Sequence, residues 1–398
     1  MGPGTRFLSG ITYYTYGLAA ALAGGGAVSV VFLRRLIPRF LYPGRARVGS
    51  PISRLELPPG VPAFDGVDWF WLPTIAQAGI FLLRRRPSVL VLQWWTGAAL
   101  HTYLALASVA RLRRAKIVVE FHEALDTGEA RIGLVGRYVG AVMPLLLRKV
   151  DGAVVHSRFD LELIRKSYAL RGKPIRVIPH APYSHYGSEE AAREAPTDAC
   201  NFLYFGVIRP FKGVEDLVRA FDAIPPGEIE RYWLTIVGET WENWTLPEEL
   251  IARSRYRDRI TFVNRYVSDE EADALFGGAD VVVLPYHRSS QSGPLHIALH
   301  LGLPVVTTRV GGLVEAVDGF EGAFLCEPRN GESLLAAMRA AADVAGERFQ
   351  AGHDWDSTSR AYRAFLGEIA SKGRSDRRAI GRRLAAPGEQ GRRAGAEH

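Results

Sequence analysis

The segment 202–223 restricts the fold of this chain more than any other part of it. An apolar run ends at Gly206, a short loop carries Arg209 and Lys212, and an amphipathic helix follows. A buried strand that passes through a glycine into a helix is typical of an open α/β sheet, which binds ligands at the carboxyl ends of its strands. Gly206 lets the backbone approach a ligand closely. Two cations at a helix start therefore indicate a bound anion such as a phosphate.

Short apolar runs alternate with helical segments through most of the chain. Runs of this length suit strands buried on both faces, and their alternation with helices predicts doubly wound parallel sheets. In the first half, strands are expected at 27–33, 88–95, 116–121, 152–155 and 175–178, with helices at 11–21, 100–113 and 136–149. In the second half, strands are expected at 201–205, 233–237, 260–262, 281–284, 305–307 and 323–325, with helices at 213–223, 269–276, 294–301 and 331–344.

A polar stretch separates these two halves. Residues 184–200 are rich in Ser, Glu, Ala and Pro and have no apolar period, so they are predicted to be a linker. A chain of 398 residues is long enough for two cores. We therefore predict an α/β protein whose two Rossmann-like domains face each other across a cleft, where ligands bind. The predicted parts are an N-terminal domain at 1–183, a C-terminal domain at 201–353, a helix at 354–370 and a basic disordered tail at 371–398.

The positive charge of the chain is concentrated at its end. Residues 371–398 contain eight Lys or Arg and three acidic residues, and so hold most of the net charge of +7. The rest of the chain is nearly neutral, which argues against nucleic acid as the main partner. The tail is predicted either to be a solubilising end or to make weak contact with an anionic membrane surface.

The sequence favours a cytoplasmic protein that is at most peripheral to a membrane. Residues 17–33 are apolar or small, but three glycines at 24–26 divide them, so we expect a helix, a turn and a strand rather than a membrane span. No signal peptide is recognised. The two cysteines, Cys200 and Cys326, cannot make a disulfide framework, which is consistent with a reducing compartment.

The segments 202–223 and 290–315 resemble the donor-binding half of the retaining glycosyltransferases of family 4, which have the GT-B fold. The resemblance covers essentially residues 5–370. It implies transfer of a sugar from a nucleotide diphosphate sugar to a hydroxyl of a carbohydrate or lipid-linked acceptor, in cell-envelope polysaccharide or glycolipid synthesis. The donor would bind mainly the C-terminal domain, and the last helix would cross back onto the first domain. The resemblance also implies no metal and no other cofactor, because Arg and Lys supply the positive charge.

Three catalytic residues follow from the resemblance. Arg209 and Lys212 would hold the diphosphate, because fixed cations stabilise the charge that the leaving group acquires in the transition state. The family usually has an arginine at the position of Val207, but a subset carries Ile-Arg-Pro-aromatic-Lys-Gly, as this chain does. His122 follows a buried strand and resembles the histidine that the family places beside the donor sugar.

Further site residues are expected in the loops that follow the strands of both domains. The donor-binding candidates are Gly10, Gly206, Gly238, Glu239, Tyr266, Val267, Gln291, Ser292, Gly293, Pro294 and Glu315. The acceptor-side candidates are Tyr13, Trp94, Glu123 and Glu129. In this interpretation the helix start after Ser292 offers backbone N–H groups to a phosphate, and Glu315 replaces a ribose-binding glutamate.

One departure from the family pattern keeps two alternatives open. Most members have two glutamates eight residues apart, where this chain has Ser289 and Ile297. Ile297 cannot accept a hydrogen bond from a ribose. The departure favours a catalytically inactive protein that binds nucleotide sugars. A nucleotide-sugar epimerase of the same fold is the other alternative, although the donor region lacks the paired acid and base residues that such an enzyme requires.

Overall fold

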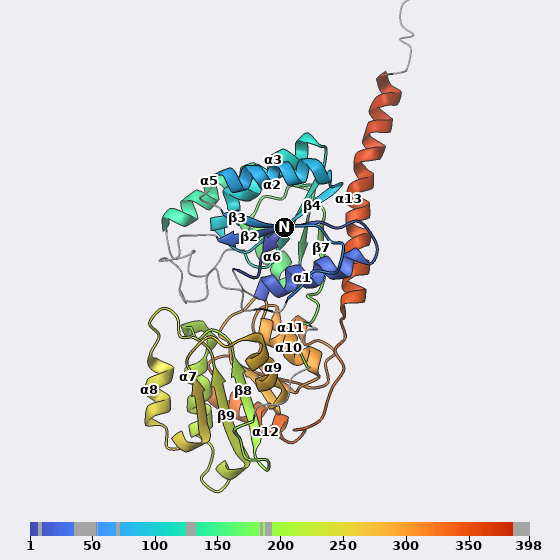
Figure 1. Ribbon diagram of the computed structural model, residues 1–398. Coiled ribbons are helices and arrows are strands. Elements are labelled where there is room, and N and C mark those ends of the chain that lie inside the picture. Colours follow the sequence, from blue (N-terminus) through green and yellow to red (C-terminus); the bar gives the residue numbers. More distant parts are fainter. Residues whose placement is uncertain are drawn as a thin grey trace, which may run out of the picture.

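The computed structural model describes residues 1–6, 10–35, 53, 55–68, 72–124, 133–183, 186–187 and 193–384, with backbone alone for 372–384. Figure 1 shows the N-terminal domain above the C-terminal domain, with the last helix running beside the upper one. All paired strands in the described sheets run parallel. The predicted α/β class with two doubly wound domains is confirmed.

The N-terminal domain contains two short sheets that Met1 joins. One sheet has the order β1-β2-β3, and the other has the order β4-β5-β6-β7. The Met1 amino group donates to Val91 O at 2.7 Å, and Gln93 N donates to Met1 O at 3.0 Å, so β1 lies beside β4. The strands are β1 Gly2–Pro3, β2 Val30–Arg35, β3 Ala63–Asp68, β4 Val89–Trp94, β5 Lys116–Phe121, β6 Gly152–Val155 and β7 Ile175–Val177.

Helices cover both faces of this domain. The helices α2, α3 and α5 pack side by side in one layer, and α1 packs against the C-terminal helix α13. Figure 1 shows the α2–α3–α5 layer at the end of the molecule that is remote from the C-terminal domain. The helices are α1 Gly10–Ala23, α2 Leu72–Arg85, α3 Leu100–Leu112, α5 Gly133–Lys149 and α6 Arg158–Ser167.

The C-terminal domain is built on one sheet of the order β10-β9-β8-β11-β12-β13. Numbered within the domain, this is 3-2-1-4-5-6, the order of dinucleotide-binding folds, whose direction of winding reverses between strands 1 and 4. Its strands are β8 Cys200–Phe205, β9 Tyr232–Val237, β10 Ile260–Val263, β11 Val281–Leu284, β12 Val305–Thr308 and β13 Ala323–Cys326. Its helices are α7 Val214–Asp222, α8 Leu246–Arg253, α9 Asp269–Gly277, α10 Gly293–Leu301, α11 Leu313–Ala316 and α12 Gly331–Ala342.

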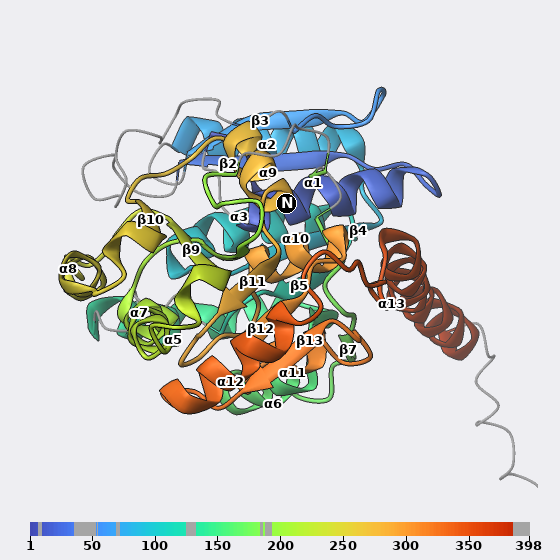
Figure 2. The ribbon, with the colours of Figure 1, turned by 90° about the horizontal axis from the view of Figure 1, so that it is seen from below.

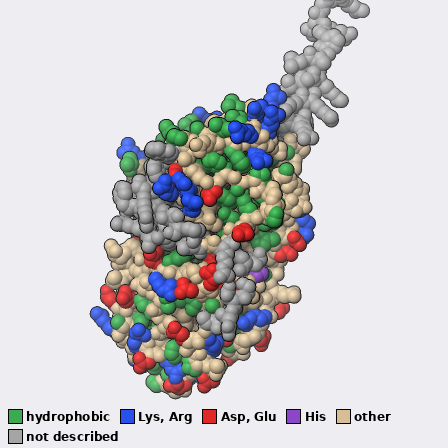
Figure 3. All heavy atoms as spheres, viewed as in Figure 1, with side chains coloured by type: hydrophobic (Ala, Val, Ile, Leu, Met, Phe, Trp, Pro, Cys, Tyr) green, Lys and Arg blue, Asp and Glu red, His purple; other side chains and the backbone are tan. Residues whose placement is uncertain are grey.

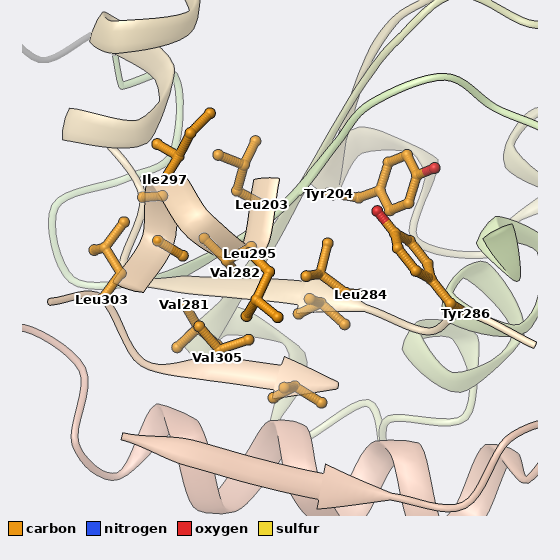
Figure 4. Packing of buried hydrophobic residues seen from close by; sticks show 14 of the residues in the cluster. Leu203, Tyr204, Val281, Val282, Leu284, Tyr286, Leu295, Ile297, Leu303 and Val305 are labelled. Atoms are coloured by element: carbon orange, nitrogen blue, oxygen red, sulfur yellow. The ribbon is translucent and has the colours of Figure 1, made fainter. Parts of the chain in front are cut away.

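Apolar strands and helix faces account for the core of this second domain. Val281, Val282 and Leu284 on β11 are fully buried and pack with side chains of β8, β12 and α10, as Figure 4 shows. The strand is apolar on both faces because helices cover both sides of a parallel sheet. The predicted capping box of α9 is confirmed, since Ser268 Oγ accepts from Glu271 N while the Glu271 carboxylate accepts from Ser268 N.

The helix α13 spans Trp355–Leu384 and crosses back to the N-terminal domain, as Figures 1 and 2 show. The Trp355 ring lies against Gly17 of α1, where a Cβ would overlap it. The Tyr362 hydroxyl donates to the buried Glu120 carboxylate on β5. The predicted end of this helix at residue 370 is wrong. Arg, Ala and Leu are good helix formers, and extending a helix that packing has already nucleated costs little.

The sequence prediction missed elements in the N-terminal domain. β3 contains Gly66 and two aspartates, residue types that are rare in strands, and it forms because it pairs with β2 and buries Val67. The helix α6 begins at a capped terminus, where Ser157 Oγ accepts from Asp160 N at 2.9 Å. The amphipathic pattern of α6 is too short to predict a helix by itself, and the structure adds the Ser157 cap that marks where the helix begins.

Candidate active site

The site lies where the order of the C-terminal sheet reverses, between β8 and β11. Loops that leave these adjacent strands contact each other there, and a Cβ at Gly213 would overlap the carbonyl oxygen of Pro285. Gly213 has φ +66°, which favours glycine. The His287 Nε2 atom lies 2.7 Å from the Asp216 carboxylate and ties the β11 loop to the first turn of α7. The fold therefore fixes the loop that carries both predicted cations.

Arg209 is largely buried in this loop and is paired with a carboxylate. Its Nε donates to Glu242 Oε1 at 2.7 Å, and its guanidinium lies 5.0 Å from the centre of the Phe211 ring. Only 9% of the Arg209 residue is exposed to solvent. The sequence analysis missed Glu242, which lies in the loop after β9. A diphosphate at this position would have to share Arg209 with Glu242.

Lys212 is half-buried beside an aromatic ring and faces the N-terminal domain. Its Nζ lies 3.6 Å from the centre of the Tyr286 ring. Burial lowers the pKa of Lys212 to about 7, while the charge of Glu123 raises that pKa and the charge of Arg209 lowers it. Lys212 has no ion pair with a described acidic side chain within 4.0 Å. The lysine is therefore the cation of this loop that a bound anion would affect most.

Arg288 is a third cation at this site, and the sequence analysis missed it. Its guanidinium lies 4.8 Å from the centre of the Phe211 ring, on the loop after β11. Arg209, Lys212 and Arg288 therefore surround one aromatic side chain at the ends of two adjacent strands. The only sequence signal for Arg288 is its place four residues beyond an apolar strand.

The start of α10 borders the same loops. Ser292 is the N-cap, with its Oγ 3.4 Å from Leu295 N and 3.2 Å from the Tyr286 hydroxyl. Gly293 and Pro294 form the first turn, and Gly293 packs against the ring of Tyr183. The Ser292 side chain is thus used in capping, which leaves the backbone of this turn as the group that could meet a phosphate.

The positions of the two missing glutamates differ in their surroundings. Ser289 Oγ donates to Gln291 O at 2.7 Å, in a half-buried loop. Ile297 is 4% exposed and packs in the core of the C-terminal domain, where Figure 4 shows it near Leu203. Ile297 therefore packs in the core of the C-terminal domain, at a position where most family members have a glutamate.

Glu315 makes a contact that the sequence analysis did not expect. Its carboxylate accepts hydrogen bonds from Arg158 N at 2.7 Å and from Phe159 N at 2.9 Å, in the first turn of α6 in the other domain. Free N–H groups and the helix dipole attract a carboxylate at this position. Both oxygens of Glu315 are thus engaged in an interdomain contact, and its binding of a ribose stays a prediction.

His122 lies in a cluster of buried imidazoles between the domains. Its ring is 4.8 Å from that of His156 and 5.0 Å from that of Tyr14, and its Nε2 has no hydrogen-bond partner among the described residues. Burial lowers the pKa of His122 well below its ordinary value, and the charge of His156 lowers it further. His180 stacks on His296 of α10 at 4.1 Å across the interface. His122 is therefore a neutral imidazole, and one of its ring nitrogens is unpaired within the described part of the chain.

The sequence analysis missed the other three histidines of this cluster. His156 and His180 follow the strands β6 and β7, and this strand-end position is the signal that could have found them. Together with His296 and Gln291 they line an interdomain cavity of about 360 Å³, which Glu315 also borders. Gln291 Oε1 lies 3.1 Å from His296 Nε2, and this contact fixes the orientation of the Gln291 amide in the wall of the cavity.

Two groups of described side chains present ligand atoms close enough for one metal ion: Glu120 with His122 and His156, and Glu215 with Asp216 and His287. In the first group, Glu120 also accepts from Tyr362. In the second group, Asp216 is already in contact with His287. The cations of the β8 loop supply positive charge at the site independently of these groups.

The remaining donor-side candidates of the C-terminal domain serve partly as structural residues. A Cβ at Gly238 would overlap the carbonyl oxygen of Gly206, so these two strand ends touch through backbone. The Glu239 carboxylate accepts from Trp241 Nε1 at 2.8 Å. Val267 is 5% exposed and packs in the core, so only its backbone can face a ligand, whereas the preceding Tyr266 is half-buried.

The N-terminal candidates fall into three groups. Gly10 O accepts from the Tyr183 hydroxyl at 2.7 Å within the N-terminal domain, whereas the Tyr13 hydroxyl donates across the interface to Asp269 at the start of α9. Glu123 is exposed on the cleft side of β5 and acts electrostatically on Lys212. Glu129 lies outside the described residues.

The acceptor-side prediction for Trp94 is wrong. Trp94 is fully buried, and its Nε1 donates to Ala124 O at 2.9 Å. It lies at the end of β4, which pairs with β5 on one side, has Met1 and β1 on the other, and is covered by helices. Its ring is therefore part of the core and cannot stack on a carbohydrate.

Comparisons with known proteins match both domains. Residues 9–181 match the model of the glycosyl transferase 4-like domain, and residues 199–343 match that of the glycosyl transferases group 1. The chain is 25% identical over 417 residues to the D-inositol 3-phosphate glycosyltransferase of Actinosynnema mirum, covering 92% of this chain and 94% of that protein.

Two other matches are a shorter alignment and a solved structure. The chain is 29% identical over 249 residues to the glycogen synthase of Mycobacterium tuberculosis, which covers 58% of this chain and only 57% of that enzyme. The fold is similar to that of sucrose-phosphate synthase from Thermosynechococcus elongatus, with a TM-score of 0.58, 18% identity and 94% of each chain covered.

Proposed function

Because this chain belongs to the group 1 glycosyl transferases, which have the GT-B fold, we propose that it is a retaining glycosyltransferase. It moves a sugar from a nucleotide diphosphate sugar to a hydroxyl of a carbohydrate or lipid-linked acceptor. One observation carries the proposal: Lys212 and Arg209 lie at the end of β8, where the sheet order reverses and a ligand cleft is expected. The setting that we propose is cell-envelope polysaccharide or glycolipid synthesis at the inner membrane face.

The cations of the β8 loop act on the leaving group. As the bond between the anomeric carbon and the phosphate oxygen breaks, negative charge grows on the diphosphate. Lys212 and Arg209 stabilise that charge more in the transition state than in the ground state, which is the condition for catalysis. The backbone N–H groups at the start of α10 add a second source of positive potential.

The N-terminal domain supplies the other wall of the site. The neutral imidazole of His122 has an Nε2 that no other described group contacts by a hydrogen bond, so it can hydrogen-bond a sugar hydroxyl. The acceptor hydroxyl then attacks the anomeric carbon from the face that the diphosphate leaves, and its proton passes to the departing phosphate oxygen. Contacts between the domains exclude water, which would otherwise hydrolyse the donor.

A protein that binds nucleotide sugars without turnover is the second candidate. Ser289 and Ile297 favour it, since the first is a small polar residue and the second is buried in the core. This candidate predicts the same binding of a nucleoside diphosphate but no product with any acceptor.

The experiment that tests the proposal incubates the full chain with a panel of radiolabelled nucleotide sugars and measures slow donor hydrolysis. Lys212→Ala is expected to lower kcat/KM for the accepted donor by about 10²–10³, as the loss of one preorganised charge does in other enzymes. Lys166→Ala, on the exposed surface of α6, is the matched control and should leave the rate unchanged.

Each outcome separates the candidates. Hydrolysis that Lys212→Ala does not slow would overturn the assignment of the leaving-group site. Binding of a nucleoside diphosphate without turnover of any donor supports the second candidate. Once a product is obtained, NMR of its anomeric proton tests retention, and an inverted linkage would contradict the proposed stereochemistry.

A further inference from the structure

The layer formed by α2, α3 and α5 contains no acidic residue. Its helices hold 14, 13 and 17 residues, and every charged side chain in them is basic. These residues are Arg84, Arg85, Arg111, Arg137, Arg148 and Lys149. A surface layer of this size normally mixes charges of both signs, so the composition indicates a partner that is negatively charged.

The same three helices expose large aliphatic side chains. Leu72, Leu112 and Leu134 are 77%, 77% and 75% exposed, and Ile80 and Leu145 are about half exposed. Five of the six large hydrophobic residues that are exposed in the described part of the chain therefore lie on one layer. Single exposed leucines are ordinary on a protein surface, but their concentration on one face marks an interaction surface.

The basic side chains gather at one edge of this layer. Because the helices connect parallel strands, their carboxyl ends point to the same edge, which lies away from the cleft. Arg86, Arg113 and Arg114 follow these ends directly and are exposed. None of them has an ion pair with a described acidic side chain, whereas Arg111 is bound to Asp151 at 2.6 Å. The edge is thus a positive rim beside Leu112, while Leu72 and Leu134 extend the exposed aliphatic surface to the amino-terminal ends of α2 and α5.

We propose that the α2–α3–α5 surface, defined by Leu72, Ile80, Leu112, Leu134, Leu145 and the basic residues beside them, docks on an anionic lipid bilayer. Leucines can enter the boundary between headgroups and acyl chains, while arginines keep their charged ends among the headgroups. The positive rim is complementary to anionic lipids. No described helix is long and apolar enough to span a bilayer, so the contact is one of surface docking.

The observations favour lipid over nucleic acid. The exposed side chains are aliphatic, whereas nucleic-acid surfaces use aromatic rings on which bases stack. Figures 1 and 3 place this end of the N-terminal domain away from the C-terminal domain, with hydrophobic and basic side chains on the face in view. Docking there leaves the cleft accessible. The inference does not rest on the proposed reaction, because it uses neither the donor nor the site residues.

Vesicle co-sedimentation of the full chain tests the proposal without any nucleotide sugar. The chain should sediment with vesicles of phosphatidylcholine and phosphatidylglycerol at low ionic strength, and binding should fall as salt is added. Vesicles of phosphatidylcholine alone should bind at least about tenfold less. Leu112→Gln with Leu134→Gln, and separately Arg113→Glu with Arg114→Glu, should each lower binding by about tenfold or more.

A matched control places the same charge reversal on the other domain. Arg253→Glu with Arg348→Glu changes two exposed arginines there and should leave binding unchanged. Thermal unfolding checks that each variant is folded. Undiminished binding by both surface variants would overturn the proposal. So would loss of binding only when Arg377, Arg378, Arg382 and Arg383 of the tail are replaced by Gln, or binding to RNA without binding to vesicles.

Discussion

Lys212 and Arg209 carry the same formal charge at the end of β8, but their surroundings differ. Arg209 is neutralised by Glu242, whereas Lys212 lies against the Tyr286 ring with a pKa of about 7. A bound diphosphate would raise the pKa of Lys212, because an opposite charge favours the protonated amine. At pH values above 7, binding of the diphosphate must therefore be accompanied by protonation of Lys212. This protonation costs free energy and lowers the measured affinity.

The affinity for the nucleoside diphosphate that binds should fall as the pH rises from 7 to 9, by up to about tenfold per pH unit. Calorimetry in buffers of different ionisation enthalpy should show uptake of close to one proton at pH 8. Lys212→Arg keeps its charge at these pH values and should remove most of the dependence. A wild-type affinity that is constant from pH 7 to 9 would show that Lys212 does not meet the diphosphate.

At the scale of elements, α13 is held to the N-terminal domain by a buried carboxylate. Glu120 is fully buried on β5 and accepts from Tyr362 of α13. Burial raises the pKa of Glu120 to about 7, although its hydrogen bonds with Tyr362 and Tyr14 oppose that shift. The docking of α13 therefore depends on the Glu120 carboxyl group, which is mostly protonated, and so neutral, only below about pH 7.

A raised pKa in the folded state means that Glu120 costs stability as the pH rises from about 4.5 to 7. Glu120→Gln, which stays neutral and can still accept from Tyr362, should raise the free energy of unfolding at pH 8 by up to about 3 kcal/mol. At pH 5 the gain should largely vanish. Urea denaturation at both pH values measures the difference.

Glu368→Gln is the control, since this residue lies near the surface on α13 and pairs with Arg176. An exposed pair contributes about 0–1 kcal/mol, so the control should show no comparable gain at pH 8. If Glu120→Gln changed stability equally at pH 5 and pH 8, the carboxyl would not titrate as its burial implies.

At the scale of the whole molecule, polar contacts hold the two domains together across the cleft. Glu315 accepts from two N–H groups of α6, and Tyr13 donates to Asp269. His180 stacks on His296 over the same interface. Because Glu315 binds two backbone N–H groups of the other domain, the balance between open and closed arrangements should be sensitive to this contact.

Glu315→Gln should shift this balance toward a more open molecule. The amide loses the charge that attracts the α6 terminus, and a hydrogen bond to a charged group contributes about 1.5–3 kcal/mol, so the ratio of closed to open forms should fall tenfold or more. Small-angle X-ray scattering should then give a larger radius of gyration. Glu332→Gln, on the exposed start of α12, should leave the radius unchanged. An unchanged radius for Glu315→Gln would mean that this contact does not control closure.

The sequence predicted the positions of the cations and of His122 along the chain, because each follows an apolar strand and the ends of parallel strands mark ligand sites. It did not predict the partners of these residues. Glu242 is 33 residues from Arg209, and Glu315 is 157 residues from Arg158. No local pattern encodes such pairs, since they exist only after the sheets have formed. Trp94 shows the same limit, because an aromatic residue at a strand end can face either a cleft or a core.

The amino-acid sequence alone determined the α/β class and most of the strands, because the apolar period and the glycine at a strand end act within a few residues. It also determined that the chain is basic. The tertiary structure decided which charges remain free, which carboxylates cap a helix of the other domain, and that basic and aliphatic side chains of α2, α3 and α5 share one surface. These properties depend on distances between remote segments, and burial and electrostatic energies follow those distances.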